Sequence, residues 1–343
     1  MLALSDTVIG ENVLDTPAID RSVTPNAMKT IDIILPVYNE EDGISSFHKK
    51  LSAVLEGLRD RYLFNVIYVL DRSQDNTFGV LKSLSERDAN LTVLHLSRRF
   101  GHQMSLVAGL DYSRGDAVIM MDSDQQHPPA VIPLLLDKFE EGFEIVHTVR
   151  EYEPTAGFLK TWTSHMFYRM HNLFSPVQLR VGAADFRLIS RKVVSVFQTS
   201  IREQNQFLRG LFQWIGYSSA TVHFVGGQRV AGKTKYRPLR LIALASIGIL
   251  SFSKLPLRLA SLLGIAISSV SLLSGIVLIV HYLWVGHVPR GYISLAVVIM
   301  LIGGLQLTFL GILGEYVGSI VDEVKRRPLY VIDEIIGARH KGA

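Results

Sequence analysis

Two carboxylates, Asp122 and Asp124, stand two residues apart directly after the short apolar run 117–121. If that run is a strand, both side chains lie at its end and can reach one divalent cation. Carboxylate oxygens are hard ligands that suit Mg²⁺ or Mn²⁺. A metal ion held there would act as a Lewis acid and offset negative charge that develops on a bound group. Because Asp-x-Asp pairs also occur in ordinary surface turns, this prediction needs support from the surrounding sequence.

Polar residues also follow two earlier apolar runs. The first run leads into Pro36-Val37-Tyr38-Asn39-Glu40-Glu41, and the second leads into Asp71-Arg72-Ser73-Gln74-Asp75. With the segment that contains Asp122 and Asp124, these make three carboxylate-rich strand ends. A site shared by the three segments requires that their strands end at one edge of a sheet.

The pattern of apolar residues predicts such a sheet between residues 29 and 150. Helical patterns such as Ile44–Leu58, with apolar residues three and four apart, lie between short β-rich runs. These runs are residues 31–37, 66–70, 91–96, 117–121 and 144–149. The alternation implies crossover connections and a mostly parallel, doubly wound sheet. Ligands of such sheets bind beyond the carboxyl ends of the strands.

Composition limits the classes of function. The chain has 343 residues, 48% of them hydrophobic, enough for one catalytic domain and an apolar C-terminal region. A net charge of +4 is too small to indicate nucleic-acid binding, although it suits anionic phosphates and lipids. Without cysteine, disulfides and thiolate nucleophiles are excluded. Residues 1–28 lack periodicity and a signal-peptide pattern, so we expect a flexible tail.

Two apolar runs predict transmembrane helices, at about 259–280 and 292–313. Each run has 22 residues and no Asp, Glu, Lys or Arg, and such a helix is about 33 Å long, enough to cross the hydrocarbon layer. A pair of buried core helices is the alternative. The uncharged run 241–253 is too short to span, and its basic flanks favour an interfacial amphipathic segment over residues 237–256 rather than a helix buried under the catalytic domain.

Charge placement predicts the orientation of these helices. Basic residues precede the first run and follow the second, whereas the connecting loop 281–291 carries only Arg290. This asymmetry places the soluble domain of residues 29–236, both termini and the segment 315–343 in the cytoplasm, with residues 257–314 as the membrane domain. Gly311, Gly314 and Gly318 offer small faces for helix packing and allow a homo-oligomer.

The ordered set of motifs resembles family 2 glycosyltransferases of the GT-A fold, a Rossmann-like α/β domain. The resemblance is greatest to the branch of bactoprenol-phosphate glucosyltransferases and dolichol-phosphate mannose synthases. It runs from about Ile31 to the C-terminus and includes the strand-end segments, residues 182–188, residues 229–236 and the Gly-Glu-Tyr and Arg-Arg-Pro-Leu-Tyr segments near the C-terminus. It implies a multi-pass enzyme of the bacterial inner membrane that transfers a sugar from a nucleotide-sugar to polyprenyl phosphate, and the expected donor is UDP-linked.

The resemblance also implies roles for the strand-end residues. In the family, side chains at these positions hold the nucleoside, since a ring can stack on the base and carboxylates can accept hydrogen bonds from base and ribose. The implied nucleotide-binding residues are Pro36, Tyr38, Glu40, Asp71 and Asp122. The implied metal ligands are Asp122, Asp124 and, as an auxiliary ligand, Gln126.

The implied catalytic residues are Asp124, through the metal, and Asp185, on the side of the acceptor. The second ionisation of a phosphate monoester lies near pH 6, with a pKa of about 6, so the acceptor is already largely ionised. Asp185 would orient this acceptor or act as a base, and direct attack would invert the anomeric carbon. The alternative is that Asp185 caps a local helix. Candidate phosphate-binding residues are Arg187, Arg229, Lys233 and Lys235.

The sequence departs from the family pattern at the second strand end. Leu70 replaces a polar residue, Arg72 replaces a glycine, and Arg99 stands where relatives tend to have asparagine. The added guanidinium groups allow an acidic donor such as a uronic acid, and an amino-sugar donor is a further variant of the reaction. His102 and His127 match no zinc pattern, and His127 is expected at the edge of the site.

The sequence also raises three alternative functions, each of which it supports less well. Residues 227–234 match a phosphate-loop pattern, but Pro238 follows at once and no further αβ units come after it. A processive polysaccharide synthase would carry Gln-x-x-Arg-Trp, whereas Gln206 and Arg209 are followed by Gly210. A non-catalytic membrane scaffold or a lipid flippase would need neither Asp122 nor Asp124, and spans without charges give a polar sugar no path.

Overall fold

The computed structural model describes residues 28–151, 183–225 and 291–337, with scattered residues between 257 and 284. Several sequence-based predictions therefore fall outside the described residues. These are the tail up to residue 27, the basic segment 229–236, the interfacial segment 237–256 and part of the first predicted span, 259–280.

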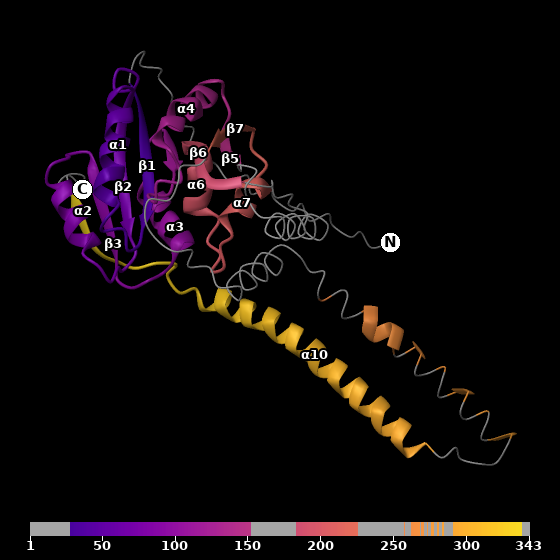
Figure 1. Cartoon of the computed structure of the whole chain (residues 1–343). Coiled ribbons are helices and arrows are strands. Elements are labelled where there is room, and N and C mark those ends of the chain that lie inside the picture. The colour runs from indigo at the N-terminus through magenta and orange to yellow at the C-terminus, as the bar shows by residue number, and fades with distance from the viewer. Residues whose placement is uncertain are drawn as a thin grey trace, which may run out of the picture.

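In the described part of the chain, eight strands form one sheet in the order β7-β5-β6-β4-β1-β2-β3-β8 (Figure 1). The predicted apolar runs are confirmed as the first five strands. The strands are β1 (Lys29–Val37), β2 (Tyr62–Leu70), β3 (Leu91–Leu96), β4 (Ala117–Met120), β5 (Ile145–Glu151), β6 (Ala183–Ser190), β7 (Ser219–Val225) and β8 (Ile332–Gly337).

Helices cover both faces of the sheet, as the alternating pattern predicts (Figure 1). One face packs against α1 (Ile44–Glu56), α2 (Thr77–Ser85) and α4 (Ile132–Glu140), the last preceded by the 3₁₀ turn η1 (Pro129–Val131). The other face packs against α3 (His102–Tyr112), α6 (Arg191–Thr199) and α7 (Leu208–Trp214). The central strands are thus buried on both sides, which explains their continuous apolar sequence.

Close packing of α3 on β1 fixes the start of α3 relative to the carboxyl edge of the sheet. A Cβ atom at Gly109 of α3 would lie 2.3 Å from Cγ2 of Ile34, so only glycine allows this approach. At the opposite edge, the wholly buried Asp32 accepts hydrogen bonds from the backbone N–H groups of Arg114 and Gly115, at 2.6 and 2.7 Å. Asp32 therefore orders the turn between α3 and β4 far from the candidate site.

The sheet is mostly parallel, as predicted, and includes two antiparallel strands, β6 and β8. Strands β1, β2, β3 and β4 are parallel, as predicted, and β5 pairs in parallel with β7. However, β6 lies antiparallel between β4 and β5, and β8 lies antiparallel beside β3. The alternating pattern covers only β1 to β5, so it carries no information on strands that join the sheet from later in the chain.

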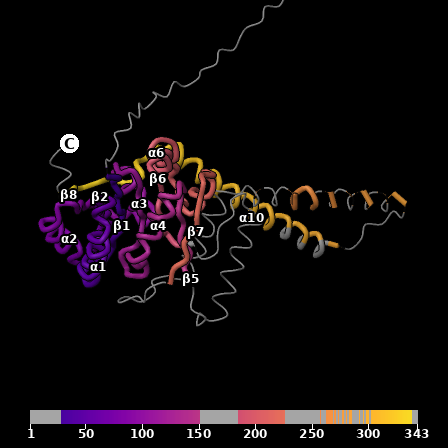
Figure 2. Tube along the Cα trace, turned by 90° about the horizontal axis from the view of Figure 1, so that it is seen from above, coloured from indigo at the N-terminus to yellow at the C-terminus, as the bar shows by residue number. Residues whose placement is uncertain are grey.

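The long helix α10 (Tyr292–Lys325) extends away from the sheet (Figures 1 and 2). It begins where the second predicted span begins but continues past the predicted end at Leu313 to Lys325. Among the described residues, one helix is long and apolar enough to cross a membrane, with the candidate span Ile302–Lys325. The described residues do not test the first predicted span.

After α10 the chain returns to the sheet, and Figure 2 shows β8 at the end of the sheet remote from α10. Arg326 has a left-handed backbone, with φ of 47°, and ends α10. Ser97 then donates a backbone hydrogen bond to Val331, at 2.9 Å, and the Tyr330 hydroxyl donates to Asp111 of α3, at 2.8 Å. The segment assigned from sequence to a cytoplasmic C-terminal region therefore supplies an edge strand of the sheet.

Candidate active site

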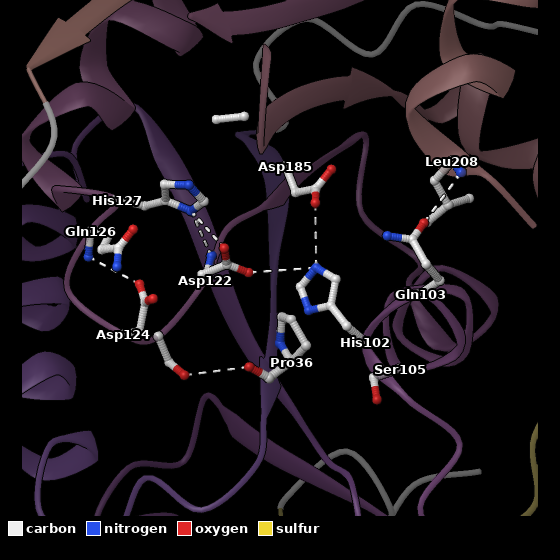
Figure 3. A network of polar contacts seen from close by, with 12 residues as sticks. Pro36, His102, Gln103, Ser105, Asp122, Asp124, Gln126, His127, Asp185 and Leu208 are labelled. Carbon is white, nitrogen blue, oxygen red and sulfur yellow. Dashed lines mark hydrogen bonds and ion pairs between the residues drawn. The ribbon is translucent and has the colours of Figure 1, made fainter. Parts of the chain in front are cut away.

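A short turn that contains Asp122 and Asp124 follows the carboxyl end of β4, and β4 lies beside β1 in the sheet (Figure 3). The Ser123 hydroxyl donates to the carbonyl oxygen of Pro36, at 3.3 Å. His127 is buried and its Nδ1 accepts a hydrogen bond from the backbone N–H of Asp122, at 2.9 Å. The ring of His127 stacks on Phe186, with 5.3 Å between centroids. His127 thus shapes the 122–127 turn from beneath.

The turn leaves both carboxylates half-buried at the edge of the sheet. The backbone N–H of Gln126 donates to Oδ1 of Asp124, at 3.0 Å. Among the described residues, no group of three or more His, Cys, Asp or Glu side chains could hold a metal ion. Two carboxylates fit a hard cation that completes its shell with water and substrate phosphate oxygens, which is how Mg²⁺ is commonly bound. The donor set therefore suits the predicted metal.

Gln126 is occupied by another partner. Its Oε1 accepts a hydrogen bond from Nη1 of Arg150, at 2.8 Å. The amide oxygen would have to leave this hydrogen bond, or share it, to reach a cation. Its role as an auxiliary metal ligand stays a prediction.

The predicted nucleoside-binding residues lie at the ends of β1 and β2. The Arg99 guanidinium lies over the ring of Tyr38, 3.9 Å from its centroid, and the backbone N–H of Glu40 donates to the hydroxyl of Thr77, at 3.0 Å. Arg72 donates through Nη1 to the carbonyl oxygen of Ser97, at 2.9 Å. Both extra arginines thus contact neighbouring chain segments of the site.

Asp71 organises the loop that follows β3. Its side chain is buried, and its two carboxylate oxygens accept hydrogen bonds from the backbone N–H groups of Phe100 and Gly101, at 2.7 and 2.9 Å. Gly101 has φ of 94°, a conformation that favours glycine, and α3 begins at the next residue. Asp71 therefore fixes where α3 starts, and direct contact with a nucleoside stays a prediction.

Asp185, Arg187 and Arg209 form a buried ionic group, here called the Asp185 cluster. Arg209 donates through Nε and Nη2 to both oxygens of Asp185, each at 2.8 Å, and Arg187 donates to Oδ1 at 3.0 Å. Burial raises the pKa of Asp185, but the two guanidinium groups and His102 outweigh it and hold the pKa well below the usual range. Asp185 is thus a fixed anion and a weak base, which favours the orienting role over the base role.

Arg187 lies inside the cluster rather than at its surface. The residue is 2% exposed and its guanidinium stacks on Phe212, 4.6 Å from the ring centroid. Burial lowers the pKa of Arg187 to about 10 despite the neighbouring Asp185 carboxylate. This burial is unfavourable for direct contact with a donor phosphate, and the phosphate-binding role of Arg187 stays a prediction. The other predicted phosphate ligands, Arg229, Lys233 and Lys235, lie outside the described residues.

His102 joins the 122–127 turn to the Asp185 cluster (Figure 3). Its Nε2 lies 3.6 Å from Oδ1 of Asp122 and 3.6 Å from Oδ2 of Asp185. Burial lowers the pKa of His102, but the two carboxylates outweigh it and raise the pKa to about 9. Sequence reasoning treated His102 as unremarkable. The available signal was its place directly after Gly101, where a helix begins at the ligand-binding edge of the sheet.

Comparison with known proteins identifies the family to which the chain is similar. The model of glycosyl transferase family 2 matches residues 32–197. A bactoprenol glucosyl transferase of Shigella phage SfII is 39% identical over 88% of this chain and 97% of its own. The uncharacterized glycosyltransferase YkcC of Bacillus subtilis is 36% identical over 90% of this chain and 95% of its own.

Among solved structures, glucosyl-3-phosphoglycerate synthase of Mycobacterium tuberculosis covers 65% of this chain and 76% of its own, with 22% identity and a TM-score of 0.44. The identities over nearly full length, and not this distant likeness, assign the family. Together with the ordered carboxylates at the carboxyl ends of parallel strands, they show that the chain belongs to glycosyl transferase family 2 and is a glycosyltransferase.

Proposed function

We propose that this enzyme transfers one sugar from a nucleotide-sugar to polyprenyl phosphate at the cytoplasmic face of the bacterial inner membrane. The main support is the near-full-length similarity to proteins named bactoprenol glucosyl transferases. The product, a polyprenyl-phosphate-sugar, would serve as a donor for cell-envelope glycans. Both predicted spans, at 259–280 and 292–313, belong to this proposal, as does the cytoplasmic placement of the catalytic sheet.

The 122–127 turn would hold the donor. Asp122 and Asp124 would bind Mg²⁺ or Mn²⁺, and the bound metal would neutralise charge on the departing nucleoside diphosphate. Tyr38 would stack on the base after the guanidinium of Arg99 has moved away from the face of the Tyr38 ring. These residues constitute the donor half of the site.

The Asp185 cluster would hold the acceptor. An oxygen of the lipid phosphate would attack the anomeric carbon from the side opposite the diphosphate, so that the new carbon–oxygen bond forms as the old one breaks and the configuration inverts. The acceptor needs little deprotonation, because the second pKa of a phosphate monoester is about 6. Asp185, held ionised by two arginines, would orient the acceptor as a fixed charge rather than take a proton.

The test uses membranes that contain the full chain, incubated with radiolabelled UDP- and GDP-sugars and polyprenyl phosphate. We expect a labelled glycolipid that depends on Mg²⁺ or Mn²⁺ and is absent with Asp124→Ala. If no sugar of the panel is transferred to the lipid, the proposed acceptor is wrong.

An acidic donor sugar is a narrower form of the same proposal. Arg72 and Arg99 both lie at the nucleotide edge of the site, and each adds a guanidinium group there. In the same assay, Arg72→Ala should reduce transfer from a UDP-uronic acid more than transfer from its neutral counterpart. An unchanged preference would exclude Arg72 from donor selection.

A further inference from the structure

We propose that His102 and Arg209 form the binding site for the phosphate of the acceptor lipid, with Nε2–H of His102 donating to a phosphate oxygen. This inference rests on the proposed function, because the lipid phosphate is its ligand. It assigns a role to a histidine that lies at the boundary between the donor half and the Asp185 cluster (Figure 3).

The position of Nε2 is the first argument. This nitrogen lies 3.6 Å from the carboxylates of both Asp122 and Asp185, which is beyond hydrogen-bond distance, and it points between them. Acceptor oxygens on two sides favour a hydrogen on Nε2, and this nitrogen donates whether the ring is neutral or charged. The His102 side chain is 41% exposed, so a ligand can reach it.

The charge of the Asp185 cluster is the second argument. Two guanidinium groups, Arg187 and Arg209, contact the carboxylate of Asp185. Arg187 is buried, whereas the Arg209 side chain is 38% exposed and lies on the accessible side. A phosphate oxygen beside Arg209 would accept a charge-assisted hydrogen bond, because the N–H groups of arginine match phosphate as well as carboxylate.

The backbone holds the two donors together. Asp71 fixes the turn at Gly101 that starts α3, and His102 is the first residue of that helix. Oε1 of Gln103 then accepts a hydrogen bond from the backbone N–H of Leu208, at 3.2 Å, directly before Arg209 (Figure 3). The starts of α3 and α7 are therefore joined. The amino end of α3 also has no side-chain cap, which adds favourable partial charge for an anion.

The test compares binding of a short-chain prenyl monophosphate and of the matching prenyl alcohol to purified full-length protein in detergent, saturated with Mg²⁺ and UDP. The wild-type protein should bind the phosphate more tightly than the alcohol. His102→Ala should reduce this preference about tenfold to a hundredfold, the usual loss for a hydrogen bond to a charged group. His102→Gln keeps an N–H at similar reach and should retain most of the preference.

Two measurements separate a binding role from a structural role. Binding of Mg²⁺–UDP, measured alone, should change little in His102→Ala, and the exposed His223 on β7 provides the matched control, His223→Gln. If His102→Ala keeps the phosphate preference, or weakens phosphate, alcohol and UDP alike, the inference is wrong. If the wild-type protein itself binds the phosphate no better than the alcohol, the proposed acceptor fails instead.

Discussion

The two carboxylate groups that His102 joins are built in opposite ways. In the donor half, the Asp122 side chain is 31% exposed and two histidines approach it at 3.6 Å. In the Asp185 cluster, the Asp185 side chain is 9% exposed and two arginines contact it at 2.8 and 3.0 Å. One half is open to solvent, as the proposed metal and diphosphate site requires, whereas the carboxylate of the other half is already paired within the fold.

This difference follows from the cost of burying charge. A carboxylate near water is solvated and stays stable without a bound cation, but a buried carboxylate must be paired within the fold. We therefore expect changes in the donor half to remove activity and leave the fold intact. Changes in the Asp185 cluster should affect both activity and stability.

The largest effect is expected in the donor half. Asp124→Ala should lower the rate of sugar transfer about a thousandfold or more. Without metal-assisted charge stabilisation, the activation free energy of the transfer rises by several kcal/mol. Glycolipid formation measures this, and the thermal midpoint should not change. Asp60→Ala, on an exposed residue, is the control. A large fall in the thermal midpoint of Asp124→Ala would show that the donor half is structural after all.

Replacement of the buried carboxylate should have the largest effect on stability. Asp185→Ala leaves Arg187 buried without its anion, and breaking such a pair costs about 3–5 kcal/mol. Thermal unfolding in detergent measures the loss. Asp185→Ala combined with Arg187→Met should recover part of it, since the uncompensated charge is then removed. A double variant no more stable than the single one would contradict this account.

The acid dependence of stability separates the two halves further. The pKa of Asp185 is well below its usual range in the folded protein, so the ionised form stabilises the fold. That contribution is complete above the unfolded pKa of about 4 and is lost as the pH falls through the lower folded pKa. The thermal unfolding midpoint of the wild-type protein should therefore decrease as the pH is lowered below about 4. For Asp185→Asn this decrease should be smaller. Parallel curves would exclude Asp185 as the source.

The smallest effect is expected where the C-terminal segment contacts α3. Tyr330→Phe removes a hydrogen bond to the carboxylate of Asp111, which should cost about 1.5 kcal/mol. Arg202 still contacts Asp111, so the fold should persist. Acceptor binding should weaken more than Mg²⁺–UDP binding, because residues 202–207 lead directly into Arg209. Equal losses for both ligands would contradict a selective link to the Asp185 cluster.

Most of the donor half was predictable from sequence. Strands β1 to β4 are apolar because both faces of the sheet are covered, and carboxylates follow the ends of β1, β2 and β4. The spacing of Asp122 and Asp124 depends only on local geometry. Such a pattern can be recognised in the sequence because residues only a few positions apart determine it.

The Asp185 cluster and His102 were not predictable in the same way. The pair of Asp185 and Arg209 depends on how α7 packs against the sheet, and Arg209 appeared in the sequence only as part of an incomplete synthase motif. The burial of Arg187 likewise depends on Phe212 from another element. Strand β8 has no alternating pattern and pairs with β3, more than two hundred residues earlier in the chain.

Strand β8 also has a consequence for biosynthesis. Translation proceeds from the N-terminus, so the edge of the sheet beside β3 is completed only after the whole of α10 has left the ribosome. Until then β3 presents an unpaired edge of the kind that promotes aggregation. Synthesis of the apolar helix α10 and closure of the sheet by β8 are therefore successive steps, and a chain stalled in α10 would leave the edge of β3 unprotected.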